Sequence, residues 1–288
     1  MSAAPGRPKQ ARTAARQGEG TPVNGSIDFE QTATVGCVTI SHPGKFNAMS
    51  RAMWRELRSV FEEAQASSGL RCVVVRGRDS HFCAGGDISE YASFRFEEAS
   101  LRAFHEDEVW GGLQAMLACD VPIIAQIEGH CMGAGVEIAS CCDIRIAGES
   151  ARFGAPIAKL GFPMAPRETE LVMREAGALT ARQLLLEAAV LGAQEMRERG
   201  FLSRVLADGL VAEDALGTAT RVAKLAPQAA RLNKRTIRAL SMRGSEQPHT
   251  NHAIDSGADQ WRDAYAYASS AEHREGVMAF IDKRQPRF

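Results

Sequence analysis

The sequence predicts an α/β fold followed by a helical C-terminal third. Two apolar runs, 70–77 and 121–127, are rich in β-branched residues and alternate with stretches whose apolar residues recur at helical spacing. After Ala165 nearly every segment has helical character, interrupted by glycines and by Pro227. Strands that alternate with helices before a run of helices indicate an α/β core with a helical extension.

Within the core, a β-prone run ends at the turn His42-Pro43-Gly44, and Ser50 is a typical N-cap for the helix that follows. The apolar stripe of that helix contains Met53, Leu57, Val60, Phe61 and Ala64. We expect strands at 35–41, 70–77, 121–127, 142–147 and 151–154, a loop at 81–87, and a polar helical stretch at about 96–118.

We divide the chain into a tail at 1–25, an α/β core at 26–215 and a C-terminal helical region at 216–288. The tail is rich in Ala, Gly and Pro, with four basic residues and one acid. It lacks the apolar region of a secretory signal, and prolines interrupt any amphipathic face of a transit peptide. We therefore expect a disordered tail.

Composition favours an ordinary globular protein: 45% of the 288 residues are hydrophobic and 24% are charged. A net charge of −1 predicts no nucleic-acid or membrane partner, and no apolar run reaches the roughly 18 residues of a membrane span. The seven cysteines have no paired metal spacing, and Cys141-Cys142 lie in an apolar helix as expected for buried thiols. Free thiols fit a reducing cytosol, so we expect a cytoplasmic protein. His249 and His252 lack further ligands nearby, and no metal site is predicted.

The most informative segment is 129–143, in which a glycine-rich turn connects an apolar run to a helix-like stretch containing Glu137. A strand, a glycine turn and a helix start form a natural anion cradle, because unpaired backbone N–H groups converge there. Apolar neighbours surround Glu137, and an acid in such a place usually has a specific partner or a raised pKa. The segment therefore offers an anion site and an acid or base beside it.

Residues 82–87 read Phe-Cys-Ala-Gly-Gly-Asp, and they and the 129–143 segment resemble two signatures of the crotonase superfamily, F-x-A-G-x-D and G-x-x-x-G-x-G-x-E-x-x-x-x-C-D. That superfamily contains enoyl-CoA hydratases and isomerases. Three further segments match in family order: the first-strand turn at 42–49, A-x-F-G-x-P at 151–156, and E-G-x-x-A-F-x-x-K-R at 275–284. The resemblance covers about 27–288.

The resemblance implies a crotonase-like spiral of ββα units with a C-terminal helical region that mediates trimerisation, giving a homotrimer or a dimer of trimers. It implies an acyl-CoA substrate whose enolate is held in an oxyanion hole by the backbone N–H groups of Gly86 and Ala134. Glu137 matches the first of two catalytic glutamates in the hydratases. No cofactor is implied other than coenzyme A as part of the substrate.

The sequence departs from the family at the second glutamate, which follows the proline of F-G-x-P in the hydratases. That position is Ile157, whose side chain cannot exchange a proton. Glu168 and Glu170 follow soon after, and helix-cap or surface roles are expected for both. The reaction is therefore expected to depend on Glu137 alone.

The resemblance also assigns contacts to coenzyme A and the acyl group. Asp87 is among these expected substrate-binding residues. An aspartate after a glycine loop, however, commonly accepts hydrogen bonds from neighbouring backbone N–H groups. The same structural role is expected for Asp143. The substrate-binding residues implied by the resemblance are Lys45, Phe46, Ala48, Ala84, Asp87, Ile88, His130, Gly133, Ile157, Phe280 and Lys283.

The resulting expectation is an enoyl-CoA hydratase-type lyase with a single catalytic glutamate. An isomerase, a decarboxylase or a thioester hydrolase on the same scaffold is the first alternative. A low-turnover acyl-CoA-binding protein is the second. No G-x-S-x-G elbow or P-loop is present, which argues against a serine hydrolase or an NTPase.

Overall fold

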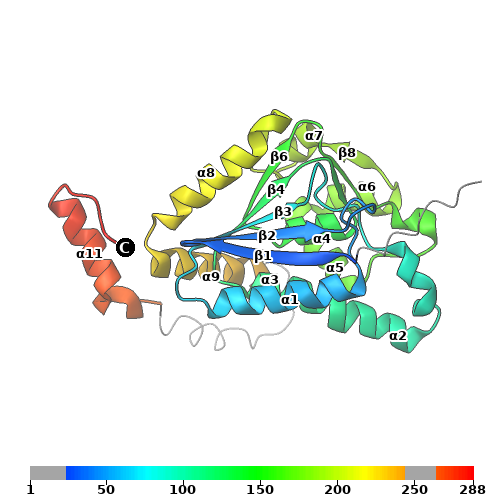
Figure 1. The fold of residues 1–288 in the computed structure, drawn as a ribbon, viewed down its shortest axis with the longest axis horizontal. Helices are drawn as coiled ribbons and strands as arrows, with labels where there is room; N and C mark the ends of the chain where they lie inside the picture. Colours follow the sequence, from blue (N-terminus) through cyan, green and yellow to red (C-terminus); the bar gives the residue numbers. More distant parts are fainter. Residues whose placement is uncertain (1–23, 244–263) are drawn as a thin grey trace, which may run out of the picture.

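A six-stranded sheet runs through the centre of the molecule (Figure 1). The computed structural model describes residues 24–243 and 264–288. The strand order is β1-β2-β3-β4-β6-β9; β1 and β2 are antiparallel, and every other neighbouring pair is parallel. The strands are β1 (Ser26–Thr32), β2 (Val35–Ser41), β3 (Cys72–Gly77), β4 (Ile123–Ile127), β6 (Ile144–Gly148) and β9 (Arg204–Leu206).

A second sheet has three short strands in the order β5-β7-β8. The central strand, β7, is parallel to β5 and antiparallel to β8. Its strands are β5 (His130–Met132), β7 (Arg152–Gly154) and β8 (Val190–Gly192). This small sheet carries the turn that leads into helix α4, and so it positions the central segment of the sequence.

Helices cover both faces of the large sheet. The α-helices are α1 (Arg51–Ala66), α2 (Glu98–Ala103), α3 (Trp110–Ala118), α4 (Ala134–Ser140), α5 (Pro166–Ala176), α6 (Ala178–Leu186), α7 (Ala193–Glu198), α8 (Val211–Ala223), α9 (Pro227–Arg243) and α11 (Ala271–Ile281). Short 3-10 segments are η1 (Ile88–Ser93), η3 (Pro156–Leu160), η4 (Asp208–Leu210) and η5 (Ala266–Ser269), and η2 (Phe104–Val109) is a π-helical turn.

The alternation of side chains along β3 explains why the sheet has two apolar faces. Val73 and Val75 point into the main core with α1 and α3, whereas Cys72 and Val74 point to the opposite face. On that opposite face, Val211, Ala215 and Ala219 of α8 cover the sheet. The helix-period spacing of these three residues gives α8 its apolar stripe.

Helix α1 forms as its sequence predicts. The Ser50 side chain accepts a hydrogen bond from the Met53 N–H at 3.3 Å, which satisfies one of the free donors of the first turn. Trp54, Leu57 and Phe61 are almost completely buried against the core. Trp54 also reaches the cavity described below, so α1 contributes to its wall.

The strands expected in the core are confirmed, with boundaries shifted by up to two residues. The predominantly helical character expected after Ala165 is confirmed in the described residues, with the two short strands β8 and β9 as unexpected exceptions. Both strands have three residues and depend on ladders with β7 and β6, so no sequence period marks them. Strand β1 was also not anticipated; it pairs along its whole length with β2. The expected helical stretch at 96–118 is divided into α2, the π-helical turn η2 and α3.

All seven cysteines are free thiols, and Cys141 and Cys142 are buried as expected. Among the helices of the described ranges, none is long and apolar enough to cross a membrane. Most of the expected disordered tail, and both His249 and His252, lie outside the described residues.

Candidate active site

Backbone hydrogen bonds join the two glycine-rich loops of the sequence. The Cys83 N–H donates to the His130 carbonyl at 2.9 Å, and the Met132 N–H donates to the Cys83 carbonyl at 2.8 Å. On its other side the first loop pairs with Met49, whose N–H donates to the Gly85 carbonyl at 2.8 Å. The 82–87 loop is therefore held between the start of α1 and strand β5.

This pairing brings Gly86 and Ala134 into the wall of the same cavity. Within 24–243 and 264–288, neither N–H donates a hydrogen bond to another residue. A Cβ atom at Gly86 would collide with the Tyr91 hydroxyl, and one at Gly135 would lie 2.7 Å from the Cys83 carbonyl oxygen. Gly135 therefore permits the close approach of the two loops, and Gly86 leaves room for the Tyr91 side chain.

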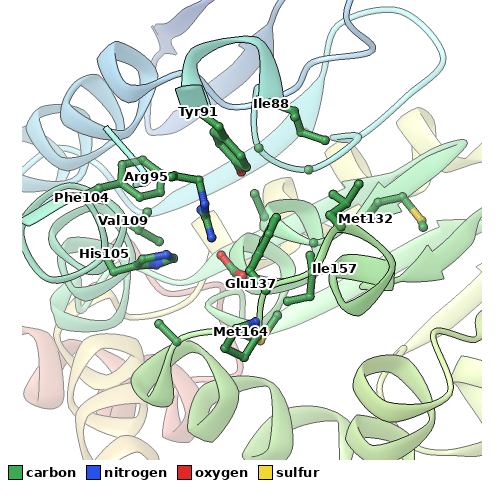
Figure 2. Close-up of a pocket in the computed structure, with 18 of the residues that line it drawn as sticks. Ile88, Tyr91, Arg95, Phe104, His105, Val109, Met132, Glu137, Ile157 and Met164 are labelled. Carbon is green, nitrogen blue, oxygen red and sulfur yellow. The ribbon is translucent and has the colours of Figure 1, made fainter. Parts of the chain in front are cut away.

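The cavity has a volume of about 210 Å³, and its wall is predominantly apolar (Figure 2). Apolar side chains come from α1, from β5 and from the η3 segment with the loop after it. Four lining residues have polar or titratable side chains: Tyr91, Arg95, His105 and Glu137. Figure 2 shows the Arg95 guanidinium and the His105 ring directed toward the carboxyl group of Glu137.

Glu137 lies in helix α4 and is only 9% exposed. Burial raises the pKa of Glu137 to about 8, and the nearby Glu168 carboxylate adds to the rise. The Glu137 side chain is therefore mainly a neutral carboxylic acid at pH 7. A neutral carboxyl has one O–H donor and one acceptor oxygen, so it can give and receive protons at once.

The expectation that Glu168 has a cap or surface role is wrong. Its side chain is almost fully buried in the first turn of α5, and the His105 ring contacts its carboxylate, with 3.1 Å between Nδ1 and Oε1. Pro166 begins α5 and Ala165 lines the cavity, so the helix start points Glu168 inward. Glu170, by contrast, is exposed as expected.

Lys45 and Asp87 form an ion pair beside the cavity, with 2.6 Å between Nζ and Oδ2. Asp87 also caps η1 by accepting from the Ser89 N–H. Burial alone would raise the pKa of Asp87, but the hydrogen bonds from Lys45 and Ser89 outweigh it and hold that pKa below its usual value. Asp143 has an equivalent structural part, since it accepts from the Ile123 N–H and pairs with Lys234.

The structure brings four of the eleven expected substrate-binding residues to the cavity wall, together with the three expected catalytic residues. Those in the wall are Ala84, Gly86, Ile88, Gly133, Ala134, Glu137 and Ile157. Ala48 is buried next to Met49, and Phe46 is 59% exposed. His130 does not line the cavity; its ring stacks on that of His81 with 4.5 Å between centroids, and Phe46 packs edge-on against both.

Phe280 and Lys283 lie in the C-terminal part, on and just after α11. Figure 1 shows α11 at the opposite end of the molecule from α2, and Phe280 is 86% exposed. Neither residue reaches the cavity of its own chain.

Sequence reasoning missed Tyr91, Arg95 and His105. They lie in η1, just after it, and in the π-helical turn η2. The polar character of 96–118 gave no sign that one face of this stretch meets Glu137. Tyr91 follows the 82–87 loop closely in the sequence, and this closeness was the only available signal that the residue lies near the site.

Comparisons with known proteins identify the family of the chain. A family model described as enoyl-CoA hydratase/isomerase matches residues 30–288. The 2,3-dehydroadipyl-CoA hydratase of Escherichia coli is 31% identical over 255 residues, which cover 87% of this chain and 93% of that protein. A probable enoyl-CoA hydratase of Mycobacterium tuberculosis is 30% identical, covering 91% of this chain and 97% of that protein. The chain belongs to the enoyl-CoA hydratase/isomerase family of the crotonase superfamily and is an enzyme of that family.

Solved structures show the same mixed α/β fold. The crystal structure of an enoyl-CoA hydratase/carnithine racemase from Magnetospirillum magneticum superposes with a TM-score of 0.83 at 32% identity, covering 91% of this chain and 94% of that chain. An enoyl-CoA hydratase subunit from Geobacillus kaustophilus has a TM-score of 0.78 at 28% identity, with 91% and 97% of the two chains covered. The crotonase-like fold is therefore confirmed.

Replacing Glu137 by Gln should change the pH dependence of stability. Between pH 4.5 and about 8 the unfolded chain has lost the Glu137 proton that the folded chain retains. Rising pH therefore lowers the free energy of unfolding, by at most about 1.4 kcal/mol per pH unit from this one group. We expect Glu137→Gln to gain stability relative to the wild type across that window, with the difference constant above it.

Urea unfolding at a series of pH values measures this difference. Glu170→Gln is the matched control, because Glu170 is exposed. A stability difference between Glu137→Gln and wild type that does not vary with pH would contradict the assignment.

Proposed function

We propose that the protein adds water to the double bond of a trans-2-enoyl-CoA thioester. The observation that carries this proposal is a buried neutral carboxyl group, Glu137, in the same apolar cavity as the two unengaged N–H groups of Gly86 and Ala134. The relatives named as enoyl-CoA hydratases support the reaction type.

The two N–H groups form an oxyanion hole for the thioester oxygen. When water attacks C3, negative charge moves from the double bond to that oxygen and makes an enolate. Each N–H donor aimed at the developing charge contributes about 3 kcal/mol, by analogy with other oxyanion holes. The apolar wall excludes water and strengthens these hydrogen bonds.

Glu137 serves as the only catalytic carboxyl group and moves both protons. The water oxygen bonds to C3 while one water proton passes to the unprotonated oxygen of Glu137. In the same concerted step the Glu137 O–H gives its proton to C2, where the electrons of the developing enolate form the new C–H bond, so the carboxyl group never carries two protons. The carboxyl group ends neutral, as it began, so no second acid is needed at Ile157.

Glu168 is a positioning residue that acts through charge. It does not line the cavity, but its carboxylate raises the pKa of Glu137 and so favours the protonated form that the reaction requires. The contact with His105 fixes the Glu168 carboxylate in place. His105 is thereby held at the cavity wall, facing Glu137 (Figure 2).

Coenzyme A is proposed to lie along the 45–48 turn and to enter beside Ile88. The Ala84 N–H already donates to the Phe46 carbonyl at 3.0 Å, which leaves the Ala84 carbonyl to accept from the nucleotide base. Lys45 would contact the phosphates while remaining anchored by Asp87. Coenzyme A arrives with the substrate, and the proposed chemistry needs no metal or other cofactor.

We also propose that the chain assembles as a trimer or a dimer of trimers through its C-terminal helices. Exposed apolar side chains gather there: Ile237 on α9 is 65% exposed, and Phe280 and Ile281 on α11 are 86% and 62% exposed. In such an assembly Phe280 and Lys283 would contact the substrate of a neighbouring subunit, which accounts for their distance from their own cavity.

Glu137→Gln should abolish hydration and leave substrate binding largely intact. Glutamine cannot pass a proton to C2, so we expect kcat to fall about 10²- to 10⁴-fold, while its similar shape preserves the pocket. Loss of enoyl absorbance measures turnover, and calorimetry with a saturated acyl-CoA measures binding. Retention of wild-type turnover would refute the catalytic role of Glu137.

Product analysis separates hydration from the other reactions of this scaffold. A 3-hydroxyacyl-CoA product supports the proposal. A shifted double bond, a released carboxyl group or free coenzyme A would each identify a different reaction. Tight binding without any product would identify an acyl-CoA-binding protein.

Glu168→Gln should move the alkaline limb of the pH–activity profile to lower pH. Activity requires protonated Glu137, so it falls as pH rises through about 8. Removing the Glu168 charge lowers the Glu137 pKa, and we expect the limb to shift by roughly half a unit to one unit. Glu170→Gln, on the exposed side of α5, should leave the limb in place. An unmoved limb in a folded Glu168→Gln variant would contradict this role.

The assembly should have three or six times the chain mass of 31.1 kDa when measured by light scattering. We expect Ile237→Asp to lower that mass, because a charge on the apolar face cannot be buried between subunits. Phe96, which is 84% exposed near α2, provides the control Phe96→Asp with unchanged mass. A monomeric wild type would refute the proposed assembly.

A further inference from the structure

Among the residues that the structure describes, Arg95 is the one permanently charged side chain in the cavity wall. Its guanidinium carbon lies 3.8 Å from the centre of the Phe162 ring and 4.5 Å from that of Tyr91. Figure 2 shows the guanidinium projecting inward from the end of η1 toward the interior of the pocket. Nothing in the hydration mechanism above uses it.

No carboxylate in the described ranges pairs with this guanidinium within 4.0 Å, and none of its side-chain N–H groups donates to a described residue. The acids around the cavity are otherwise engaged: Glu168 contacts His105, and Asp87 pairs with Lys45. Glu137 is the remaining acid; Figure 2 shows the guanidinium directed toward its carboxyl group, but no ion pair or hydrogen bond joins these two side chains. The positive charge of Arg95 therefore has no internal counterion among these groups.

An unpaired cation in an apolar wall is costly, and burial accordingly lowers the pKa of Arg95. Stacking on the aromatic rings offsets part of that cost. Stacking occupies the faces of the planar guanidinium but leaves its N–H donors, which lie in the plane, free to bind an anion. Their fork matches a carboxylate with two parallel hydrogen bonds.

The position of Arg95 indicates which part of a substrate would supply the anion. The thioester end is fixed by Gly86 and Ala134, and the nucleotide end is expected near Lys45, on the outer side of the 82–87 loop. Arg95 lies with Phe104 and His105 in the wall formed by the segment after that loop. This wall faces the acyl group.

We propose that Arg95 binds a carboxylate on the acyl group, so that the substrates are enoyl-CoA thioesters of dicarboxylic acids. This inference rests on the proposed function, because it assigns the acyl group of the same cavity. The carboxylate replaces the missing counterion, and the stacked rings hold the guanidinium ready to receive it. Unsubstituted acyl chains would leave the Arg95 charge unpaired.

Matched pairs of substrates test the proposal: a trans-2-enoyl-CoA and its counterpart of equal chain length with a terminal carboxylate. We expect the wild type to prefer the carboxylated member by about 10- to 100-fold in kcat/KM for at least one chain length. Arg95→Met should remove this preference, and Arg95→Lys should retain only part of it, because lysine lacks the planar fork.

Arg167→Met is the matched control. Arg167 also lies over an aromatic ring, that of Trp110, but it pairs with Glu106 and does not line this cavity. Its replacement should leave the preference unchanged. A wild type that prefers unsubstituted chains at every length, or an Arg95→Met variant that keeps the wild-type preference, would overturn the proposal.

Binding measurements separate this inference from the proposed reaction. Calorimetry with saturated diacid and monoacid acyl-CoA pairs needs no turnover. Tighter diacid binding that is lost in Arg95→Met would support the carboxylate site even if no hydration occurred. Equal binding of both members, together with hydration of unsubstituted enoyl-CoA, would overturn the inference and leave the proposed function standing.

Discussion

The site depends on the two hydrogen bonds through which Cys83 pairs with His130 and Met132 of β5. Each loop by itself is an ordinary glycine turn, and the pairing places Gly86 and Ala134 in the wall of one cavity, as the proposed oxyanion hole requires. Because β5 also pairs with β7, the small sheet fixes the second loop independently of substrate. Donors that are already oriented need no rearrangement when charge develops, and this is the main advantage of a preorganised site over water.

Electrostatics in the cavity are arranged around a carboxyl group that resists ionisation. Burial and the Glu168 charge both favour the protonated form of Glu137, whereas the Asp87 carboxylate is kept charged by Lys45 at the edge of the same site. The wall thus separates a neutral acid, which can exchange protons, from ion pairs that hold the structure. Arg95 differs from both, because its charge faces the cavity without a partner among the described groups.

The sequence was sufficient for the local features and insufficient for those that depend on distant partners. The apolar stripe of α1 and the glycine loops were readable because their signals lie within a few neighbouring residues. The inward position of Glu168 could not be read from the sequence. It depends on α5 beginning beside the cavity and on the contact between Glu168 and His105. Strands β8 and β9 were missed for the same reason: their hydrogen bonds come from β7 and β6, not from their own pattern.

The π-helical turn at Phe104–Val109 has a consequence for how this wall can vary. A π turn accommodates one more residue than an α-helical turn, so the side chains before and after it are rotated relative to a continuous helix. Loss of one residue there would restore α-helical phase and turn the preceding side chains by about 100° about the axis. A single deletion could thus withdraw His105 from the cavity while sparing the loops that hold Gly86 and Ala134. The wall that carries Arg95 and His105 is therefore able to diverge by changes of length, separately from the loops that carry Gly86 and Ala134.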